Sequence, residues 1–362
     1  MQRPATDEPP RPERGLVLGG RTPGGPAPCP RDRTDGSTIG SPGALRHRST
    51  FVPGADWLDH DGKPIEAHTG GMFHQDSTYY WVGASWQGGF GFRSFNLYSS
   101  TNLQDWTFVN TLLRPSSDLP ATHEIARPKI LFNERTSSYV MWFKRKNYSA
   151  PINDVRPGVA VSDSLDGGWS FHRDFYPGEG GTRAYNTADF CLWQEPDGSG
   201  YLVASSPSPR NGTYGRRIVI FRLTPDYRGV EPDPAYIGPL DDREAPAVFA
   251  RRGTYYLITS GTSGWAANQA TYRTAPSILG PWSDQRTLGD ETTFHSQPDF
   301  VVPVGGTRDT TYIYAGGRHV AENLDSSRYV WLPLSFTGEE MRLENRPSWS
   351  LDVESGRWTP GR

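Results

Sequence analysis

A short aromatic pattern typical of a β-strand recurs five times along the sequence, and this repeat constrains the fold more than any other feature. The five copies are TYYWVGAS from Thr78, SSYVMWFK from Ser137, SGYLVASS from Ser199, TYYLITSG from Thr254 and TTYIYAGG from Thr310. The tyrosines that align within them are 60, 62, 54 and 57 residues apart. A period this regular indicates one supersecondary unit that is repeated five times.

Each copy follows another short apolar run and a turn, and it precedes a further β segment. Composition agrees, because 12 Trp, 17 Tyr and 16 Phe accompany only four Met, and large rings suit pleated, half-buried strands better than helix faces. Three or four antiparallel strands per unit are typical of propeller blades. We therefore predict an all-β fold, a five-bladed β-propeller. A β-sandwich or two smaller β domains have similar strands but do not explain a period that persists five times.

The repeat places the domain boundary near residue 49. Residues 1–48 contain nine Pro, eight Gly and eight Arg without hydrophobic periodicity, so we expect a disordered tail there and the propeller over 49–362. The tail lacks the apolar stretch of a signal peptide, and no segment is long and apolar enough to span a bilayer. Localisation stays open, with an extracellular site favoured by the class of substrate inferred below.

The charge of the body excludes two classes of partner. Of 37 basic and 40 acidic residues, the tail holds eight and five, which leaves 29 against 35 in the body. A weakly acidic body offers no footprint for nucleic acid or for an anionic membrane. We expect a neutral ligand and a monomeric protein.

A polar residue stands at the expected start of the innermost strand in every unit. The five are His68, Glu124, Asp189, Glu244 and Gln297. Because innermost strands line the channel of a propeller, these side chains should converge at one end of the axis. Converging carboxylates are costly unless function or cations offset them. Glycoside hydrolysis needs such a pair, with one protonated acid and one group that directs water.

The segments that carry these residues resemble glycoside hydrolase family 43, and more closely its exo-β-1,3-galactanase branch. They are HTGGMFHQDSTYYWVG, ARPKILFNERTSSYVMWF, DFCLWQEPDGSGYLVASS, REAPAVFARRGTYYLITSGTSGW and HSQPDFVVP. The resemblance covers about residues 55–340. It implies a five-bladed propeller and inversion of the anomeric centre.

The resemblance also implies roles for the convergent residues. Glu244 matches the general acid, and Asp189 matches the carboxylate that raises the pKa of that acid and orients it. Most of the family has an aspartate base on the first blade, where this chain has Ala67-His68. In the galactanase branch, which also lacks that aspartate, Glu124 and Gln297 are the equivalents that hold water and sugar. Whether Gln297 acts as an unusual tautomer or Glu124 takes the proton stays open.

By the same resemblance, five further residues surround the galactose, and His68 joins them as a binding residue. The five are Tyr148, Asn211, Thr262, Gly264 and Trp265. Rings fit the apolar face of a sugar, and hydrogen bonds to O4 distinguish galactose from its epimer. The eight His show no zinc-binding spacing, so we expect no catalytic metal or cofactor. A structural Ca²⁺ or Na⁺ in the channel is compatible with the sequence.

The sequence therefore predicts an inverting, exo-acting glycosidase that degrades polysaccharide by releasing galactose from β-1,3-galactan, such as the backbone of arabinogalactan. One alternative within the family is an α-L-arabinofuranosidase or a β-xylosidase, and the missing first-blade aspartate argues against it. The other alternative is a non-catalytic sugar-binding propeller. The pairing of Glu244 with Asp189 argues against that, because a pure binder has little use for two adjacent carboxylates.

Overall fold

The computed structural model describes residues 49–150, 154–210 and 213–361, and this part of the chain is all-β. It contains 23 strands and one 3₁₀ helix, η1 (Leu324–Ser326). Five antiparallel sheets have four strands each, and in every one the strands pair in the order in which they occur in the chain. The expected tail, residues 1–48, lies outside the described residues.

The strand bounds follow the repeat. The first sheet contains β2 (His68–Gln75), β3 (Thr78–Gln87), β4 (Gly91–Ser100) and β5 (Thr107–Leu113). The second contains β6 (Glu124–Asn133), β7 (Ser138–Asn147), β8 (Asp154–Ser162) and β9 (Ser170–Asp174). The third contains β10 (Phe190–Gln194), β11 (Gly200–Arg210), β12 (Thr213–Arg222) and β13 (Tyr236–Ile237).

The fourth sheet contains β14 (Arg243–Arg251), β15 (Thr254–Gly261), β16 (Ala270–Ala275) and β17 (Arg286–Leu288). The fifth contains β18 (Gln297–Gly305), β19 (Thr310–Arg318), β20 (Arg328–Thr337) and β21 (Glu340–Leu343). The five aromatic runs of the sequence form the second strand of each sheet, namely β3, β7, β11, β15 and β19. The repeat is therefore a repeat of four-stranded sheets.

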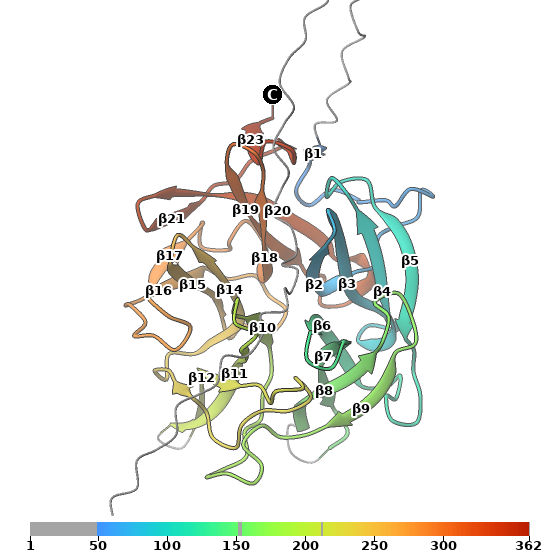
Figure 1. Cartoon of the computed structure of the whole chain (residues 1–362), viewed down its shortest axis with the longest axis vertical. Coiled ribbons are helices and arrows are strands. Elements are labelled where there is room, and N and C mark those ends of the chain that lie inside the picture. Colours follow the sequence, from blue (N-terminus) through green and yellow to red (C-terminus); the bar gives the residue numbers. More distant parts are fainter. Residues whose placement is uncertain (1–48, 151–153, 211–212, 362) are drawn as a thin grey trace, which may run out of the picture. The chain divides into compact units, whose positions relative to one another are not determined.

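The first strands of the five sheets contact one another in a ring. β2 contacts β6, β6 contacts β10, β10 contacts β14, β14 contacts β18, and β18 contacts β2 again. Figure 1 shows these strands nearest the common centre of the sheets. Residues at the starts of these five strands are thus brought to one place from positions more than 200 residues apart in the chain.

A sixth sheet, which the sequence repeat does not predict, joins the two ends of the described chain. It has three strands in the order β1 (Ser49–Phe51), β22 (Trp349–Asp352) and β23 (Arg357–Pro360). Phe51 pairs with Trp349, and their rings stack with centroids 4.3 Å apart. The first strand of the body is therefore held by a hairpin that follows the fifth sheet.

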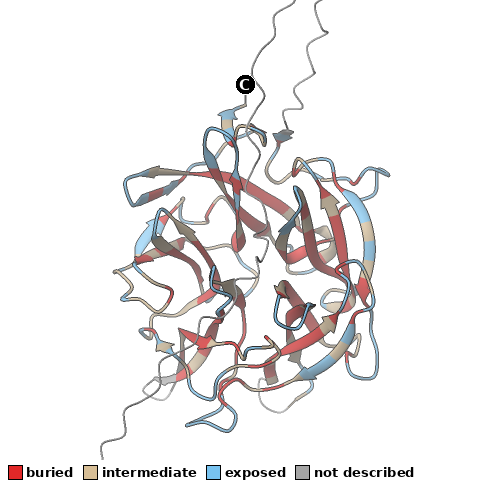
Figure 2. Cartoon of the chain, in the orientation of Figure 1, coloured by how far each residue is buried: buried red, intermediate tan, exposed pale blue. Residues whose placement is uncertain are grey.

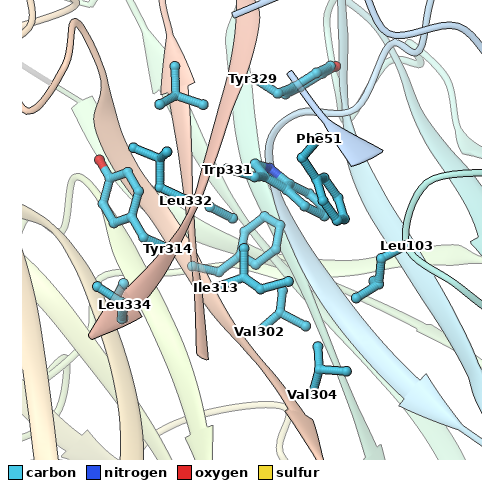
Figure 3. Close-up of a cluster of buried hydrophobic side chains, with 14 of the residues drawn as sticks. Phe51, Leu103, Val302, Val304, Ile313, Tyr314, Tyr329, Trp331, Leu332 and Leu334 are labelled. Atoms are coloured by element: carbon cyan, nitrogen blue, oxygen red, sulfur yellow. The ribbon is translucent and has the colours of Figure 1, made fainter. Parts of the chain in front are cut away.

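The core is rich in aromatic residues and lies between the sheets. Trp81, Trp86 and Trp142 are fully buried, so these strand tryptophans are core residues. Figure 2 shows buried residues concentrated on the inner strands and exposed ones on outer strands such as β5. In the largest cluster, Phe51 lies beside Trp331, with centroids 6.2 Å apart (Figure 3). Cys191 is a small, buried residue of this core.

Four of the five innermost strands carry a β-bulge within their first six residues. The register shifts lie between His68 and Gly71, Ala126 and Lys129, Glu244 and Ala247, and Pro298 and Phe300. In three of them a non-glycine residue has positive φ, namely Thr69 at 51°, Arg127 at 55° and Ala245 at 49°. A bulge changes the direction in which neighbouring side chains point. The bulges therefore orient the residues at the starts of these innermost strands.

Candidate active site

The five residues predicted to converge stand at the starts of the innermost strands. His68, Glu124 and Gln297 are the first residues of β2, β6 and β18, Glu244 is the second residue of β14, and Asp189 directly precedes β10. None of the five is more than 8% exposed. Ionisable groups withdrawn this far from water must be paired or must change their protonation, so their partners decide what the site can do.

Glu124 is held as a carboxylate. Lys144, on the neighbouring strand β7, places its Nζ 2.5 Å from Oε1, and the Tyr148 hydroxyl donates a hydrogen bond to Oε2. Burial alone would raise the pKa of Glu124, but Lys144 and the Tyr148 hydrogen bond outweigh burial and lower it. Glu124 is therefore ionised across the neutral range and has no proton to give.

Asp189 is a second permanent carboxylate. Arg127 places its Nε 2.8 Å from Oδ1, and the Nζ of Lys144 lies 3.2 Å from the same oxygen. Burial opposes ionisation, yet Arg127 and then Lys144 dominate and hold the pKa of Asp189 far below its usual range. Because Lys144 contacts both Glu124 and Asp189, one ammonium group fixes two strands of the ring relative to each other.

Glu244 behaves in the opposite way. Within the described ranges its closest cation is Arg216 on β12, whose Nε is 3.6 Å from Oε2, a weaker contact than those of the other two carboxylates. Burial, followed by the negative charge of Asp189, raises the pKa of Glu244 to about 7. Glu244 can therefore carry a proton at neutral pH while Glu124 and Asp189 remain ionised. A pair of carboxyl groups whose pKa values are driven apart is the arrangement required for general acid catalysis.

Gln297 is fixed by the loop that follows β15. Its Nε2 donates to the carbonyl oxygens of Gly264, at 2.8 Å, and Ala266, at 2.6 Å. The amide nitrogen is therefore fully used, and the amide oxygen is the atom left to accept a hydrogen bond. Gly264, a predicted binding residue, reaches the site through this backbone carbonyl.

Trp265 on the same loop closes one side of the site. Its ring meets the edges of Trp86, at 6.3 Å between centroids, and His319, at 4.9 Å. Lys144 lies 5.8 Å from the centroid of the same ring, so Trp265 stands next to the cation that joins Glu124 and Asp189. The structure thus brings Trp265 to the cluster.

His68 and His319 are two neutral imidazoles at the site. His68 stacks on Tyr329, with centroids 5.4 Å apart. Burial, followed by nearby arginine charge, lowers the pKa of each histidine to about 3. Among the described residues, the Nε2 of neither one has a hydrogen-bond partner. Both can therefore act as uncharged hydrogen-bonding groups and neither can act as a proton donor at neutral pH.

One predicted binding residue is not joined to this cluster, and another lies outside the described residues. Thr262 is exposed on the loop after β15, and no hydrogen bond within the described part of the chain connects it to the five convergent residues. Asn211 lies outside the described residues. Tyr148 is joined to the cluster through Glu124.

Sequence reasoning missed the cations and one of the imidazoles. Arg127, Lys144, Arg216 and His319 contact the predicted residues directly, yet no repeat position or motif marks them. A signal did exist for Arg127 and Lys144, because buried carboxylates require cationic partners and these residues lie in apolar strands. The choice between them and other basic residues depends on strand register, which the sequence does not show.

A second layer of charge lies below the carboxylates. Arg127 also contacts Asp299, Nη1 to Oδ1 at 3.5 Å, and Lys129 donates to the carbonyl oxygens of Thr69, at 3.3 Å, and Gly70. Both side chains are buried, and burial lowers the pKa of Lys129 to about 7. They occupy the carboxylate and carbonyl oxygens that a channel Ca²⁺ or Na⁺ would require. Within the described residues, no group of three or more His, Cys, Asp or Glu side chains is placed to hold a metal ion.

The fold and this site are those of a carbohydrate-active enzyme. Comparison with known proteins identifies its family. The family model for glycosyl hydrolases family 43 matches residues 64–312. The chain therefore belongs to family 43, and it is a glycosidase. No curated protein matches the sequence. No helix in the described ranges is long and apolar enough to cross a membrane.

The similar solved structures agree with the predicted branch of the family. An exo-β-1,3-galactanase from Clostridium thermocellum is 31% identical with a TM-score of 0.78, covering 86% of this chain and 68% of its own. An exo-β-1,3-galactanase from Phanerochaete chrysosporium, solved with galactose, is 30% identical with a TM-score of 0.78, covering 87% and 71%. A family 43 β-1,3-galactosidase with galactodeoxynojirimycin is 27% identical with a TM-score of 0.74, covering 82% and 99%. The resemblance to the exo-β-1,3-galactanase branch is confirmed.

Proposed function

We propose that the protein is an inverting, exo-acting hydrolase of β-1,3-galactan built on a five-bladed β-propeller. The observation that carries the proposal is the separation of the three carboxyl groups into one protonated acid, Glu244, and two groups that are ionised at neutral pH, Asp189 and Glu124. The ring of contacts among the five first strands supports five blades. The similarity to exo-β-1,3-galactanases supports the substrate.

In the proposed reaction, the protonated Glu244 gives its proton to the glycosidic oxygen as the bond from that oxygen to the anomeric carbon breaks. A water molecule attacks the anomeric carbon from the opposite face in the same step, which inverts the configuration. Asp189 keeps the proton on Glu244 until it is needed. The charge distribution favours Glu124 over the neutral Gln297 as the group that takes the proton from water.

Gln297 then positions the water. Because its Nε2 is bound to two carbonyl oxygens, its Oε1 is turned away from them and can accept a hydrogen bond from the attacking water. Glu124 supplies the negative charge that accepts the proton, and Gln297 orients the attacking water. Loss of Gln297 should therefore reduce turnover less than loss of Glu244 does.

We propose that the sugar lies against Trp265, with His68 and Tyr148 as hydrogen-bonding groups and Thr262 and Gly264 contributed by the loop after β15. Neutral imidazoles suit an uncharged sugar, since either ring nitrogen can donate or accept. Asn211 belongs to the same proposal by resemblance alone. An arabinofuranosidase or xylosidase would keep the acid and its neighbour, so the substrate must be tested directly.

The test is incubation of the purified protein with β-1,3-galactooligosaccharides, arabinoxylan and aryl glycosides, followed by chromatography of the released sugars. Galactose alone, with β-1,3-linked substrate consumed from one end, is the expected result. NMR of the first-formed sugar should show inversion, and retention would refute that part. Glu244→Gln should lose several orders of magnitude in turnover, whereas Glu195→Gln, which changes a glutamate bound to Tyr255, should not.

Arabinose or xylose in place of galactose would overturn the substrate and keep the fold and the acid. If no sugar is released from any of the substrates while sugar binding is still measurable, a non-catalytic sugar-binding protein would be favoured. We further propose that the reaction requires no metal ion, because Arg127 already places a buried positive charge between Asp189 and Asp299. Dialysis against a chelator should therefore leave activity unchanged, and loss restored by Ca²⁺ would contradict this.

A further inference from the structure

A second hollow lies far from the carboxylates, at the other ends of the inner strands. Its volume is about 950 Å³. It is lined by the turn after β14, the turn after β18, part of β20 and the hairpin of β22 and β23. Glu244 and Arg251 stand at opposite ends of β14, seven residues apart, which is roughly 23 Å in an extended strand. We call this hollow the arginine groove.

The arginine groove carries an excess of positive charge. Four arginines line it, Arg251, Arg252, Arg308 and Arg357, against one acid, Asp309. Arg252, Arg308 and Arg357 are exposed. In the described ranges, none of the four arginines forms an ion pair with a carboxylate. Exposed guanidinium groups gathered around one hollow without acidic partners form an attractive site for a carboxylated ligand.

Aromatic rings and hydroxyl groups complete the lining. Tyr312, Phe336 and Trp358 are half-buried there. Arg251 lies over the Phe336 ring, 4.3 Å from its centroid, and donates to the carbonyl of Gly338 at 3.1 Å. The hydroxyl-bearing residues Thr307, Thr310, Ser335 and Thr359 also line the groove. Rings that face the apolar side of a sugar and hydroxyls that bind its edges are the usual elements of a carbohydrate site.

We propose that the arginine groove is a second carbohydrate-binding site, which takes a segment of polysaccharide whose sugars carry carboxylate groups. Guanidinium pairs with carboxylate in a planar, two-bonded geometry, so the three exposed arginines, Arg252, Arg308 and Arg357, select uronic acid residues over neutral sugars. The volume is sufficient for more than one sugar unit, at the upper end of ligand pockets of about 300–1,000 Å³. The polysaccharide is thus recognised both by its carboxylate groups and by its sugar rings.

Such a site would act through effective concentration. A polysaccharide chain held at the arginine groove remains near the catalytic end of the same molecule, which raises the local concentration of chain ends without any new contact at the carboxylates. The proposal does not depend on the identity of the sugar that is hydrolysed. It concerns binding at a place where no residue of the proposed reaction lies.

The test is titration calorimetry of the whole protein with oligogalacturonate as the carboxylated probe and β-1,3-galactooligosaccharide as the neutral one. Substitution Arg308→Gln together with Arg357→Gln should weaken oligogalacturonate binding at least tenfold. Both residues are exposed at turns or strand ends, and thermal unfolding checks that the variant folds. Arg135→Gln is the matched control, because Arg135 is an exposed arginine in the corresponding turn of the second sheet.

Hydrolysis of a short β-1,3-galactooligosaccharide should be the same in wild type and in the double variant, since neither arginine is near Glu244. Several results would overturn the proposal. These are no binding of oligogalacturonate by the wild type, equal weakening in Arg135→Gln, or no difference between the double variant and the wild type. Tighter binding of an oligonucleotide of equal charge would assign the groove to a different class of ligand and would also overturn it.

Discussion

At the residue scale, identical chemistry gives opposite protonation. Glu124, Asp189 and Glu244 are all buried carboxyl groups, and burial raises the pKa of each. Lys144 and Arg127 reverse the effect for the first two, whereas Arg216 stands too far from Glu244 to do so. Glu244 is thus the proposed general acid because, among the described residues, no cation lies close enough to stabilise its ionised form.

The first prediction concerns the pH profile. Because Glu244 must be protonated and its pKa is raised to about 7, kcat/KM should fall as pH rises through that value. Asp189→Asn removes the neighbouring negative charge, so the fall should move to lower pH in addition to any loss of rate. Initial rates on a short galactooligosaccharide measure it. Asp197→Asn, at an exposed turn, is the control, and an unmoved alkaline limb in Asp189→Asn would contradict the assignment.

The second prediction concerns stability. The folded-state pKa of Glu244 lies above its unfolded value of 4.5, so wild-type stability falls as pH rises from the unfolded to the folded pKa. The Glu244→Gln variant does not lose stability in this way, because glutamine does not titrate. Relative to wild type, the variant should gain on the order of 3 kcal/mol in the free energy of unfolding between pH 4 and pH 8. Denaturant titration at both pH values measures it, and an identical difference at the two values would argue against a buried, protonated glutamic acid.

At the element scale, the bulge of the first sheet depends on glycine. β2 and β3 approach so closely at the first bulge that a Cβ on Gly83 would lie 2.0 Å from the backbone carbon of Ala67, and one on Gly70 would lie 1.9 Å from the carbonyl oxygen of Val82. Only residues without a side chain permit this contact. The bulge in turn places His68 at the entrance of the ring.

Gly83→Ala should therefore destabilise the protein by about 2–3 kcal/mol, the usual cost of overpacking, and should weaken substrate binding by displacing His68. Thermal unfolding and KM on the short substrate test the two effects. Gly167→Ala is the matched control, since a Cβ there meets its nearest atom at 3.6 Å. If both variants unfold at the same temperature, the close approach is not what shapes this strand.

At the scale of the whole described unit, the ring is closed by contacts of β18 with β2 and by the sixth sheet. Phe51, in β1, stacks on Trp349 in β22 and lies beside Trp331 in β20 (Figure 3). The cluster around it contains residues of the first, fourth and fifth sheets. Loss of this one ring should weaken the junction at which the beginning and the end of the body meet.

Phe51→Ala is expected to lower the free energy of unfolding by about 3–5 kcal/mol, the range for a fully buried phenylalanine. The neighbouring Val52→Ala is the control, because Val52 is 46% exposed and Phe51 only 2%. Urea titration followed by tryptophan fluorescence measures both variants. Equal midpoints would show that the sixth sheet does not hold the unit together.

The sequence by itself determined the number of repeated units, the second strand of each sheet and the five residues at the entrances, because periodicity and the spacing from each aligned tyrosine are local properties of the chain. Only the tertiary structure decided the rest. Arg127, Lys144 and His319 join the site through pairings across strands and bulges, and one residue of register moves a side chain to the other face. The sixth sheet pairs Phe51 with Trp349 across almost 300 residues, and the arginine groove gathers four separate turns and strands, contacts between distant segments that no local pattern encodes.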